Sequence, residues 1–366
     1  MEQEPSSQTP GYLRFTPGRP LSLWHRYVAR LLVHFYYSSL KFFTPNGLRV
    51  APLNGEIPTL LLASHRNGAT DGWVFNQLLP TAQFLTAVQL LRSRFLRLMF
   101  AGIPVVRDKD RQRYGYSRAQ AGNPILHAIA HLKQSGSVIV FPEGTSEWGP
   151  GPQPYQPGTA KIVRRLMQDR CRFQVVVAGC FYQAPDRLGS AVELLVSEPL
   201  VLPEQGDASA AEWEQNIQQC LSHALDRVSV NCRDEQMLAQ VAEQAWSSRR
   251  AGDSYAQAFK QAEQQTLSEP VITASPVTPS LLDHLLWRLF ILTLLPVWFV
   301  GWWVGRKADG RNTTTFFRLA GGFAMALIWL PCLLIAAIFY PWLLLVYGAA
   351  VLGWRRRGKF AGANLE

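Results

Sequence analysis

The segment LLLASHRNGATDGWVF (60–75) carries two residues that could do chemistry together, His65 and Asp71. A strand predicted over 58–64 leads into a loop, and strand-to-helix loops of α/β domains commonly present reactive side chains. An imidazole can accept a proton from a hydroxyl and return it to a leaving group when a carboxylate fixes its tautomer. The pair is therefore a candidate general base and its orienting acid. The alternative is structural, with Asp71 capping a helix that begins at Gly72 and His65 packing or facing solvent.

The elements that must position this pair follow from the hydrophobic pattern of residues 50–230. Short apolar segments alternate with helical patterns there, which is typical of an α/β domain with a central mixed sheet flanked by helices. The predicted strands cover 58–64, 83–88, 103–106, 137–141, 173–180 and 192–197, and the clearest helical patterns cover 89–100, 118–134 and 157–169. We expect residues 231–266 to be a helical extension and the Pro-, Ser- and Thr-rich segment 267–280 to be a linker.

The amino-terminal region has two parts. Residues 1–20 form a polar, Pro-rich tail without the apolar run of a secretory signal, so we expect this end to stay in the cytosol. Residues 21–43 are predicted to form a basic amphipathic helix with Arg26, Arg30, His34 and Lys41 along one face. Such a helix is suited to a bilayer interface. The alternative is an ordinary helix packed on the core.

The carboxyl-terminal region 281–354 is apolar enough to enter a membrane, with blocks at 285–305 and 319–353, the second interrupted at Pro331 and Pro341. Basic residues lie in the intervening loop and in the tail 355–366, and the positive-inside rule places both on the cytosolic side. The first block would then dip in and return, bending near Pro296, unless it is a plain span with the loop outside. A hydrophobic dimer interface is the alternative to membrane insertion.

The composition and net charge of the chain indicate which kinds of partner and substrate it suits. Of the 366 residues 48% are hydrophobic and only 17% are charged, and the net charge of +10 suits anionic lipid or phosphorylated substrates. The basic residues are interleaved with apolar runs, which argues against nucleic acid as a partner. Five scattered cysteines, without a CxxC pair or neighbouring histidines, predict neither a disulfide framework nor a metal site. His127 and His131, four residues apart, are interpreted as packing or surface residues.

Four segments, in order, resemble the motifs of the glycerolipid acyltransferases, the family of glycerol-3-phosphate and 1-acylglycerol-3-phosphate acyltransferases. They are SHRNGATD (64–71), GIPVVR (102–107), FPEGTS (141–146) and the divergent VVVAG (175–179). Five residues separate the histidine from the aspartate where the family usually has four, and this variant is similar to a subgroup that resembles the yeast-type glycerol-3-phosphate acyltransferases. The extra residue requires a bulge, for which Gly68 provides the backbone freedom.

The resemblance implies roles for individual residues. His65 and Asp71 would be catalytic, and Arg107 would bind the acceptor's phosphate, its alternative role being an ion pair with Asp108 or Asp110. Residues Glu143, Gly144, Thr145 and Ser146 would bind the acceptor, with Glu143 accepting hydrogen bonds from glycerol hydroxyls or from Arg107. The family commonly carries Arg after FPEGT, whereas this chain has Ser146, so the contact to the acceptor's head group must differ.

The implied protein is a membrane-bound O-acyltransferase with a glycerol-3-phosphate acyltransferase-like fold. It would move an acyl group from acyl-CoA or acyl-carrier protein to a lysophospholipid, first of all 1-acylglycerol 3-phosphate, without a metal or other cofactor. Glycerol 3-phosphate and another lysolipid, such as lyso-ornithine lipid, are alternative acceptors, and a catalytically silent membrane adaptor is the alternative that is not an enzyme. The expected location is a bacterial inner membrane, with the catalytic domain facing the cytoplasm.

Overall fold

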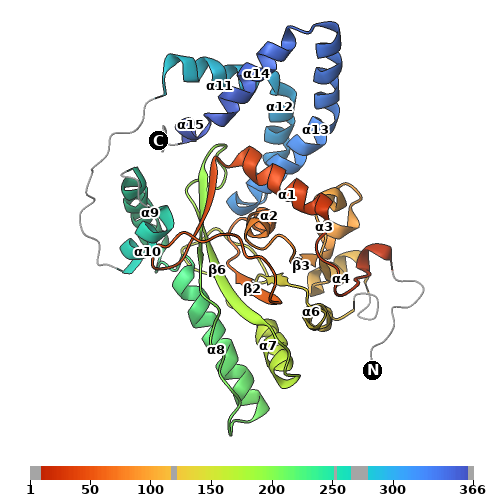
Figure 1. Cartoon of the computed structure of the whole chain (residues 1–366), viewed down its shortest axis with the longest axis vertical. Helices are drawn as coiled ribbons and strands as arrows, with labels where there is room; N and C mark the ends of the chain where they lie inside the picture. Colours follow the sequence, from red (N-terminus) through yellow and green to blue (C-terminus); the bar gives the residue numbers. More distant parts are fainter. Residues whose placement is uncertain (1–9, 117–121, 251–253, 265–278, 362–366) are drawn as a thin grey trace.

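Seven strands form one mixed sheet in the order β1-β7-β6-β2-β5-β3-β4 (Figure 1). The computed structural model describes residues 10–116, 122–250, 254–264 and 279–361. All neighbouring strands run parallel except β6 and β7. The strands are β1 (Ser39–Phe43), β2 (Thr59–Ala63), β3 (Gln83–Ala87), β4 (Ile103–Val105), β5 (Val138–Val140), β6 (Gln174–Tyr182) and β7 (Ala191–Val196). The predicted α/β class and mixed sheet are confirmed, and all six predicted strands are present.

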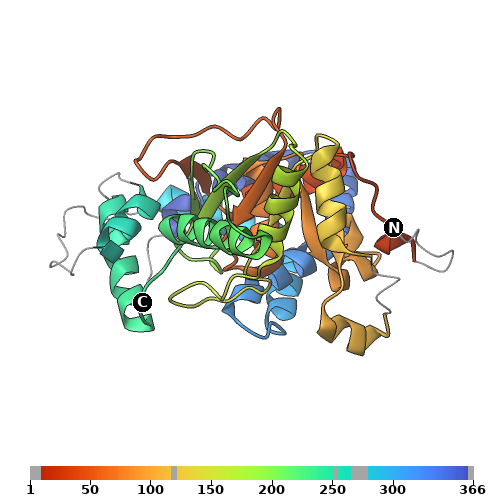
Figure 2. The ribbon, with the colours of Figure 1, turned by 90° about the horizontal axis from the view of Figure 1, so that it is seen from below.

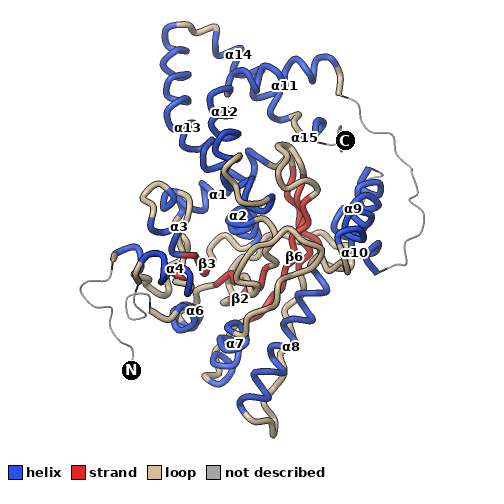
Figure 3. Tube along the Cα trace, turned by 180° about the vertical axis from the view of Figure 1, so that it is seen from behind, coloured by secondary structure: helices blue, strands red, loops and turns tan. Residues whose placement is uncertain are grey.

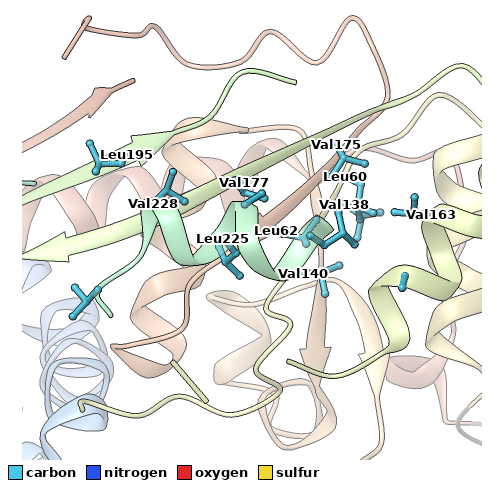
Figure 4. Packing of buried hydrophobic residues seen from close by; sticks show 14 of the residues in the cluster. Leu60, Leu62, Val138, Val140, Val163, Val175, Val177, Leu195, Leu225 and Val228 are labelled. Carbon is cyan, nitrogen blue, oxygen red and sulfur yellow. The ribbon is translucent and has the colours of Figure 1, made fainter. Parts of the chain in front are cut away.

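The central strands are apolar along their whole length because both faces of the sheet are covered. All five residues of β2 are buried, and alternate side chains enter opposite cores. Leu60 and Leu62 belong to one hydrophobic cluster, whereas Leu61 and Ala63 belong to the other. Figure 4 shows the first cluster, in which the β2 leucines meet valines of β5 and β6 and residues of a covering helix.

One face of the sheet is covered by α6, α7, α8, α9 and α10. The other is covered by α1, α2 and part of α13. Figure 2 shows α9 and α10 at one end of the molecule and the amino-terminal segment at the other. The bounds are η1 (Gly11–Leu13), α1 (Leu23–Tyr36), α2 (Gly68–Leu78), α3 (Val88–Arg92), η2 (Leu96–Leu98), α4 (Asp108–Tyr114), α6 (Pro124–Lys133), α7 (Gly158–Gln168), α8 (Ala210–Val228), α9 (Glu235–Arg250) and α10 (Tyr255–Gln264).

Several predicted boundaries were wrong. The helix predicted over 21–43 ends at Tyr36, and residues 39–43 instead form β1, which pairs in parallel with β7. The helical pattern over 89–100 is broken into α3 and η2. The polar tail is not free after residue 9, since Leu13 is buried. The predicted linker lies outside the described residues except for 279 and 280, as do residues 118–121 of the helix predicted over 118–134.

Helix α1 combines both interpretations of its sequence. Its inner face is buried and packs on α2, as an ordinary core helix would. Its outer face nevertheless exposes large apolar side chains beside its arginines, namely Leu23, Trp24, Tyr27 and Leu31. Exposed aromatic and aliphatic residues next to basic ones are typical of an interfacial helix. Lys41 does not belong to this face, because it lies in β1.

Four apolar helices project beyond one end of the sheet, as Figures 1 and 3 show. They are α11 (Leu281–Thr293), α12 (Leu295–Gly305), α13 (Arg311–Phe339) and α14 (Leu343–Arg355), followed by the short α15 (Gly358–Ala361). Within the described residues only α13 is by itself long and apolar enough to cross a membrane, and 11% of its most apolar stretch is buried. Most of this stretch is therefore exposed apolar surface. Pro331 does not interrupt α13, contrary to the prediction.

The first apolar block is bent by 76° between α11 and α12, at Leu294 and thus two residues before Pro296. Both ends of this pair approach the α/β domain. At one end Asp283 pairs with Arg356 and Lys359 of the basic tail, and at the other the turn after α12 leads into Arg311, which pairs with Asp186. The predicted bend near Pro296 is therefore present, in a helix pair that is either a broken span or a re-entrant segment.

The basic tail also contacts the domain directly. The Arg357 side chain is buried and donates hydrogen bonds to the backbone carbonyls of His34 and Tyr37 at the end of α1. The last carbonyls of a helix lack partners within the helix, and a basic side chain satisfies them well. Both basic segments thus lie on the domain side of the apolar helices.

Candidate active site

The loop between β2 and α2 brings His65 and Asp71 together. The distance from His65 Nδ1 to Asp71 Oδ2 is 3.0 Å. Helix α2 begins at Gly68 rather than at Gly72, so Asp71 lies in its first turn and its carboxylate reaches back over the loop. Gly68 has φ +54°, in the left-handed region that favours glycine, which confirms the predicted bulge.

Asp71 is fully buried, and protein donors surround its carboxylate. Oδ2 also accepts the backbone N–H of Asn67 at 2.8 Å, and Oδ1 accepts the Tyr182 hydroxyl at 2.6 Å. Burial raises the pKa of the Tyr182 phenol well above its usual value, so this group stays protonated and continues to donate. Three donors hold the carboxylate in one orientation and compensate its loss of water.

The imidazole of His65 is fixed on two sides. Its ring stacks on Phe141 with centroids 4.2 Å apart, and 16% of its side chain is exposed. Because Nδ1 is bonded to Asp71, the Nδ1–H tautomer is favoured and Nε2 is left as the basic nitrogen. A base whose ring cannot rotate and whose free nitrogen faces a partly open site is suited to proton abstraction.

The FPEGTS turn after β5 holds the loop between β2 and α2 through hydrogen bonds to Glu143. Glu143 is 5% exposed, and its two oxygens accept the backbone N–H groups of His65 at 2.7 Å and Gln153 at 3.0 Å. Burial raises the pKa of Glu143. Of the two donors expected for Glu143, Arg107 does not reach it, since Arg107 is bonded to Asp110; the glycerol hydroxyls stay a prediction. Glu143 holds the histidine backbone in place.

The other residues of this turn lie closer to solvent. Gly144, with φ +69°, and Thr145 are exposed, and Ser146 is half-buried. The backbone N–H of Glu147 donates to the carbonyl of His65 at 3.2 Å, so the turn runs directly beside the loop that carries His65. The predicted acceptor-binding residues are therefore neighbours of His65.

Arg107 lies elsewhere along the sheet edge. It follows β4, and β5 and β3 separate β4 from β2, which corresponds to roughly 14 Å across the sheet. Its Nε donates to Asp110 Oδ2 at 2.8 Å. The structure thus contains the ion pair given as the alternative, and it does not bring Arg107 beside His65 and Glu143.

Sequence reasoning missed a second group of residues beside the loop that carries His65. Arg66 is 5% exposed and its guanidinium lies over the Trp148 ring, 4.7 Å from the centroid. Arg311, the first residue of α13, lies over the same ring at 5.1 Å. Asn312 Nδ2 donates to the carbonyl and hydroxyl oxygens of Ser146 at 2.8 and 3.1 Å. The basic GRKADGRNT segment was visible in the sequence, but nothing in it pointed to Trp148.

The two histidines of α6 pack, as predicted. His131 is buried and accepts the backbone N–H of Gly18 at 2.9 Å, and Phe15 contacts both rings. Among the described residues no cluster of three or more His, Cys, Asp or Glu side chains could bind a metal ion.

Comparison with protein-family models found no match for this chain, and comparison with curated proteins found no relative.

Proposed function

We propose that the protein is a membrane-bound O-acyltransferase that moves a fatty acyl group from an acyl thioester to the hydroxyl of a lysophospholipid. The preferred acceptor is 1-acylglycerol 3-phosphate, which would give phosphatidic acid. The observation that carries the proposal is the 3.0 Å contact between His65 Nδ1 and Asp71 Oδ2, in a loop flanked by the FPEGTS turn. The motif order that resembles the glycerolipid acyltransferases supports the same reaction.

In the proposed mechanism His65 Nε2 accepts the proton of the acceptor hydroxyl as its oxygen attacks the thioester carbonyl. Asp71 stabilises the imidazolium that forms, and its own charge is held by Asn67 and Tyr182. The tetrahedral intermediate then collapses, the C–S bond breaks, and the imidazolium returns the proton to the leaving thiolate. The products are an ester and a free thiol. An acyl thioester is already activated, so the protein supplies positioning and proton transfer.

Membrane attachment supports a lipid substrate. The exposed apolar face of α1 and the largely unburied α13 are both suited to an apolar environment, and basic residues lie where the apolar helices meet the α/β domain. We propose that the helices α11–α14 enter the cytoplasmic leaflet of a bacterial inner membrane and that the catalytic domain faces the cytoplasm. The acyl chains could then stay in lipid while the polar ends reach His65.

The alternative acceptors are glycerol 3-phosphate and another lysolipid such as lyso-ornithine lipid, and acyl-carrier protein could replace CoA as the donor. Ser146 in place of the family's arginine is compatible with each of them. A catalytically silent adaptor is less well supported, because a charged dyad of this geometry has no stabilising advantage over an apolar pair.

The experiment uses the full chain in detergent or nanodiscs with labelled acyl-CoA and a panel of the three acceptors. Wild type should give product from lysophosphatidic acid, and His65→Ala should reduce kcat by about a hundred- to ten-thousandfold. His223→Ala, at an exposed position on α8, is the matched control and should behave as wild type. Transfer by His65→Ala at the wild-type rate would contradict the mechanism.

A further inference from the structure

Three segments far apart in the sequence meet beside the catalytic loop: Arg66 after β2, Trp148 after the FPEGTS turn, and Arg311 at the start of α13. Both guanidinium groups lie over the indole ring, with Cζ at 4.7 and 5.1 Å from its centroid. Stacking on an aromatic ring fixes the plane of a guanidinium and leaves its N–H groups at the edge available to an acceptor. We call this group the Arg66–Trp148–Arg311 cluster.

Arg66 is the unusual member of the cluster. It is 5% exposed, yet no hydrogen bond or ion pair joins its guanidinium to any residue that the structure describes. The nitrogen atoms of Arg66 are not among the buried side-chain atoms without a partner, so these N–H groups reach the surface, where an acceptor can contact them. The carboxylates of Glu143 and Asp71 act on it electrostatically, but each is bonded to other donors. An anion from outside the protein would satisfy it.

Arg311 is positioned by contacts of its own. Its guanidinium donates to Asp186 Oδ1 at 3.1 Å and remains half-exposed, so it can contact a second acceptor. The turn that carries it is docked on the catalytic loop through Asn312, which bonds Ser146. A Cβ added to Gly68 would meet the Asn312 carbonyl oxygen at 2.8 Å, which shows how closely the two backbones approach. The turn before α13 is thus a wall of the site.

We propose that the Arg66–Trp148–Arg311 cluster binds a phosphate group of a substrate, in place of the Arg107 expected from the sequence. The proposal rests on the proposed acyl transfer at His65 and names the anion that this site recognises. Two guanidinium groups offer charge and bidentate donors to a phosphate, which carries more charge and more acceptor oxygens than a single oxyanion. Because Arg311 belongs to an apolar helix, substrate binding would depend on how that helix is seated.

The phosphate could come from the acceptor's glycerol 3-phosphate group or from the CoA of the donor. Equilibrium dialysis in the His65→Ala background separates binding from turnover, with labelled glycerol 3-phosphate and CoA as the two probes and glycerol as the uncharged reference. Arg311→Gln should weaken binding of one probe by about ten- to a hundredfold, the effect of losing one charge-assisted contact. Loss for glycerol 3-phosphate alone assigns the acceptor, and loss for CoA alone assigns the donor.

The matched control is Arg306→Gln, because Arg306 lies in the same turn and stacks on a different indole, Trp302, at 4.9 Å. It should change neither affinity by more than about twofold, since it keeps every contact of the cluster. Arg66→Lys, which keeps the charge and loses the planar fork, should show an intermediate loss.

The inference would be overturned if Arg311→Gln bound glycerol 3-phosphate and CoA each as tightly as Arg306→Gln does. A fall in kcat for Arg311→Gln with unchanged binding of both probes would also overturn it, because the cluster would then act on the reacting oxyanion. If Arg311→Gln weakens binding of glycerol 3-phosphate or CoA but the wild-type protein transfers no acyl group to any acceptor, this inference stands and the proposed function fails.

Discussion

Replacing Asp71 by Asn tests the central pair with little change of shape. The amide oxygen can face His65 and Asn67 while its NH2 group faces the Tyr182 hydroxyl, which can accept as well as donate. The Nδ1–H tautomer of His65 is then retained, and the main loss is the negative charge beside the imidazolium. This substitution therefore isolates the electrostatic contribution of the carboxylate.

The magnitude follows from the geometry. The 3.0 Å contact between Nδ1 and Oδ2 places the centres of the two charges about 4 Å apart, and at an effective dielectric constant near 20 their attraction is about 4 kcal/mol. Since each 1.36 kcal/mol changes a rate tenfold, that energy corresponds to about a thousandfold in kcat. The amide oxygen still accepts a hydrogen bond, so we expect a loss of about a hundred- to a thousandfold.

The assay measures kcat for transfer from labelled acyl-CoA to lysophosphatidic acid at saturating substrates. Asp207→Asn, in an exposed loop, is the control and should keep wild-type activity. Thermal melting of each variant shows whether the fold is retained. An Asp71→Asn protein that is folded and fully active, alongside an inactive His65→Ala protein, would refute the assigned role of the carboxylate.

Three further predictions concern the loop, the buried glutamate and the apolar helix. Gly68→Ala should lower the free energy of unfolding by about 1–3 kcal/mol and reduce activity, because residue 68 has φ +54° and an added Cβ would press on Asn312. The control Gly72→Ala, where a Cβ has open space in the first turns of α2, should be neutral or slightly stabilising. Equal denaturant midpoints for the two variants would refute this prediction. Burial raises the pKa of Glu143 above its usual 4.5, so the folded protein binds this proton more tightly than the unfolded chain does. The resulting stabilisation is complete below about pH 4.5 and is lost as the pH rises through the raised value. The melting temperature of Glu143→Gln relative to wild type should therefore increase with pH from 4.5 upward, and a constant difference would be the contrary result. Cys332 is exposed on α13 and should react with a membrane-impermeant maleimide only after detergent is added. The Cys332→Ser variant measures the labelling of the other cysteines. Labelling of Cys332 in intact vesicles would place this helix in water.

Local pattern was sufficient for much of the fold. The runs of apolar residues predicted six strands, because a strand buried on both faces must be apolar throughout. Strand β1 was missed because SLKFF follows a helical pattern without a turn signal, and only pairing with β7 makes it a strand. The bend of the first apolar block was anticipated from its proline and from the charge of the loop that follows it.

Some features of the candidate site were likewise predictable from the sequence, whereas others depend on tertiary contacts. The spacing of His65 and Asp71, with Gly68 between them, already predicted that the two side chains would meet where β2 leads into α2. Tertiary structure alone decided that Glu143 holds the histidine backbone, that Arg107 pairs with Asp110, and that Arg311 reaches Trp148. Such contacts join segments tens to hundreds of residues apart, and their partners depend on how strands are ordered and helices docked, which no local sequence pattern encodes.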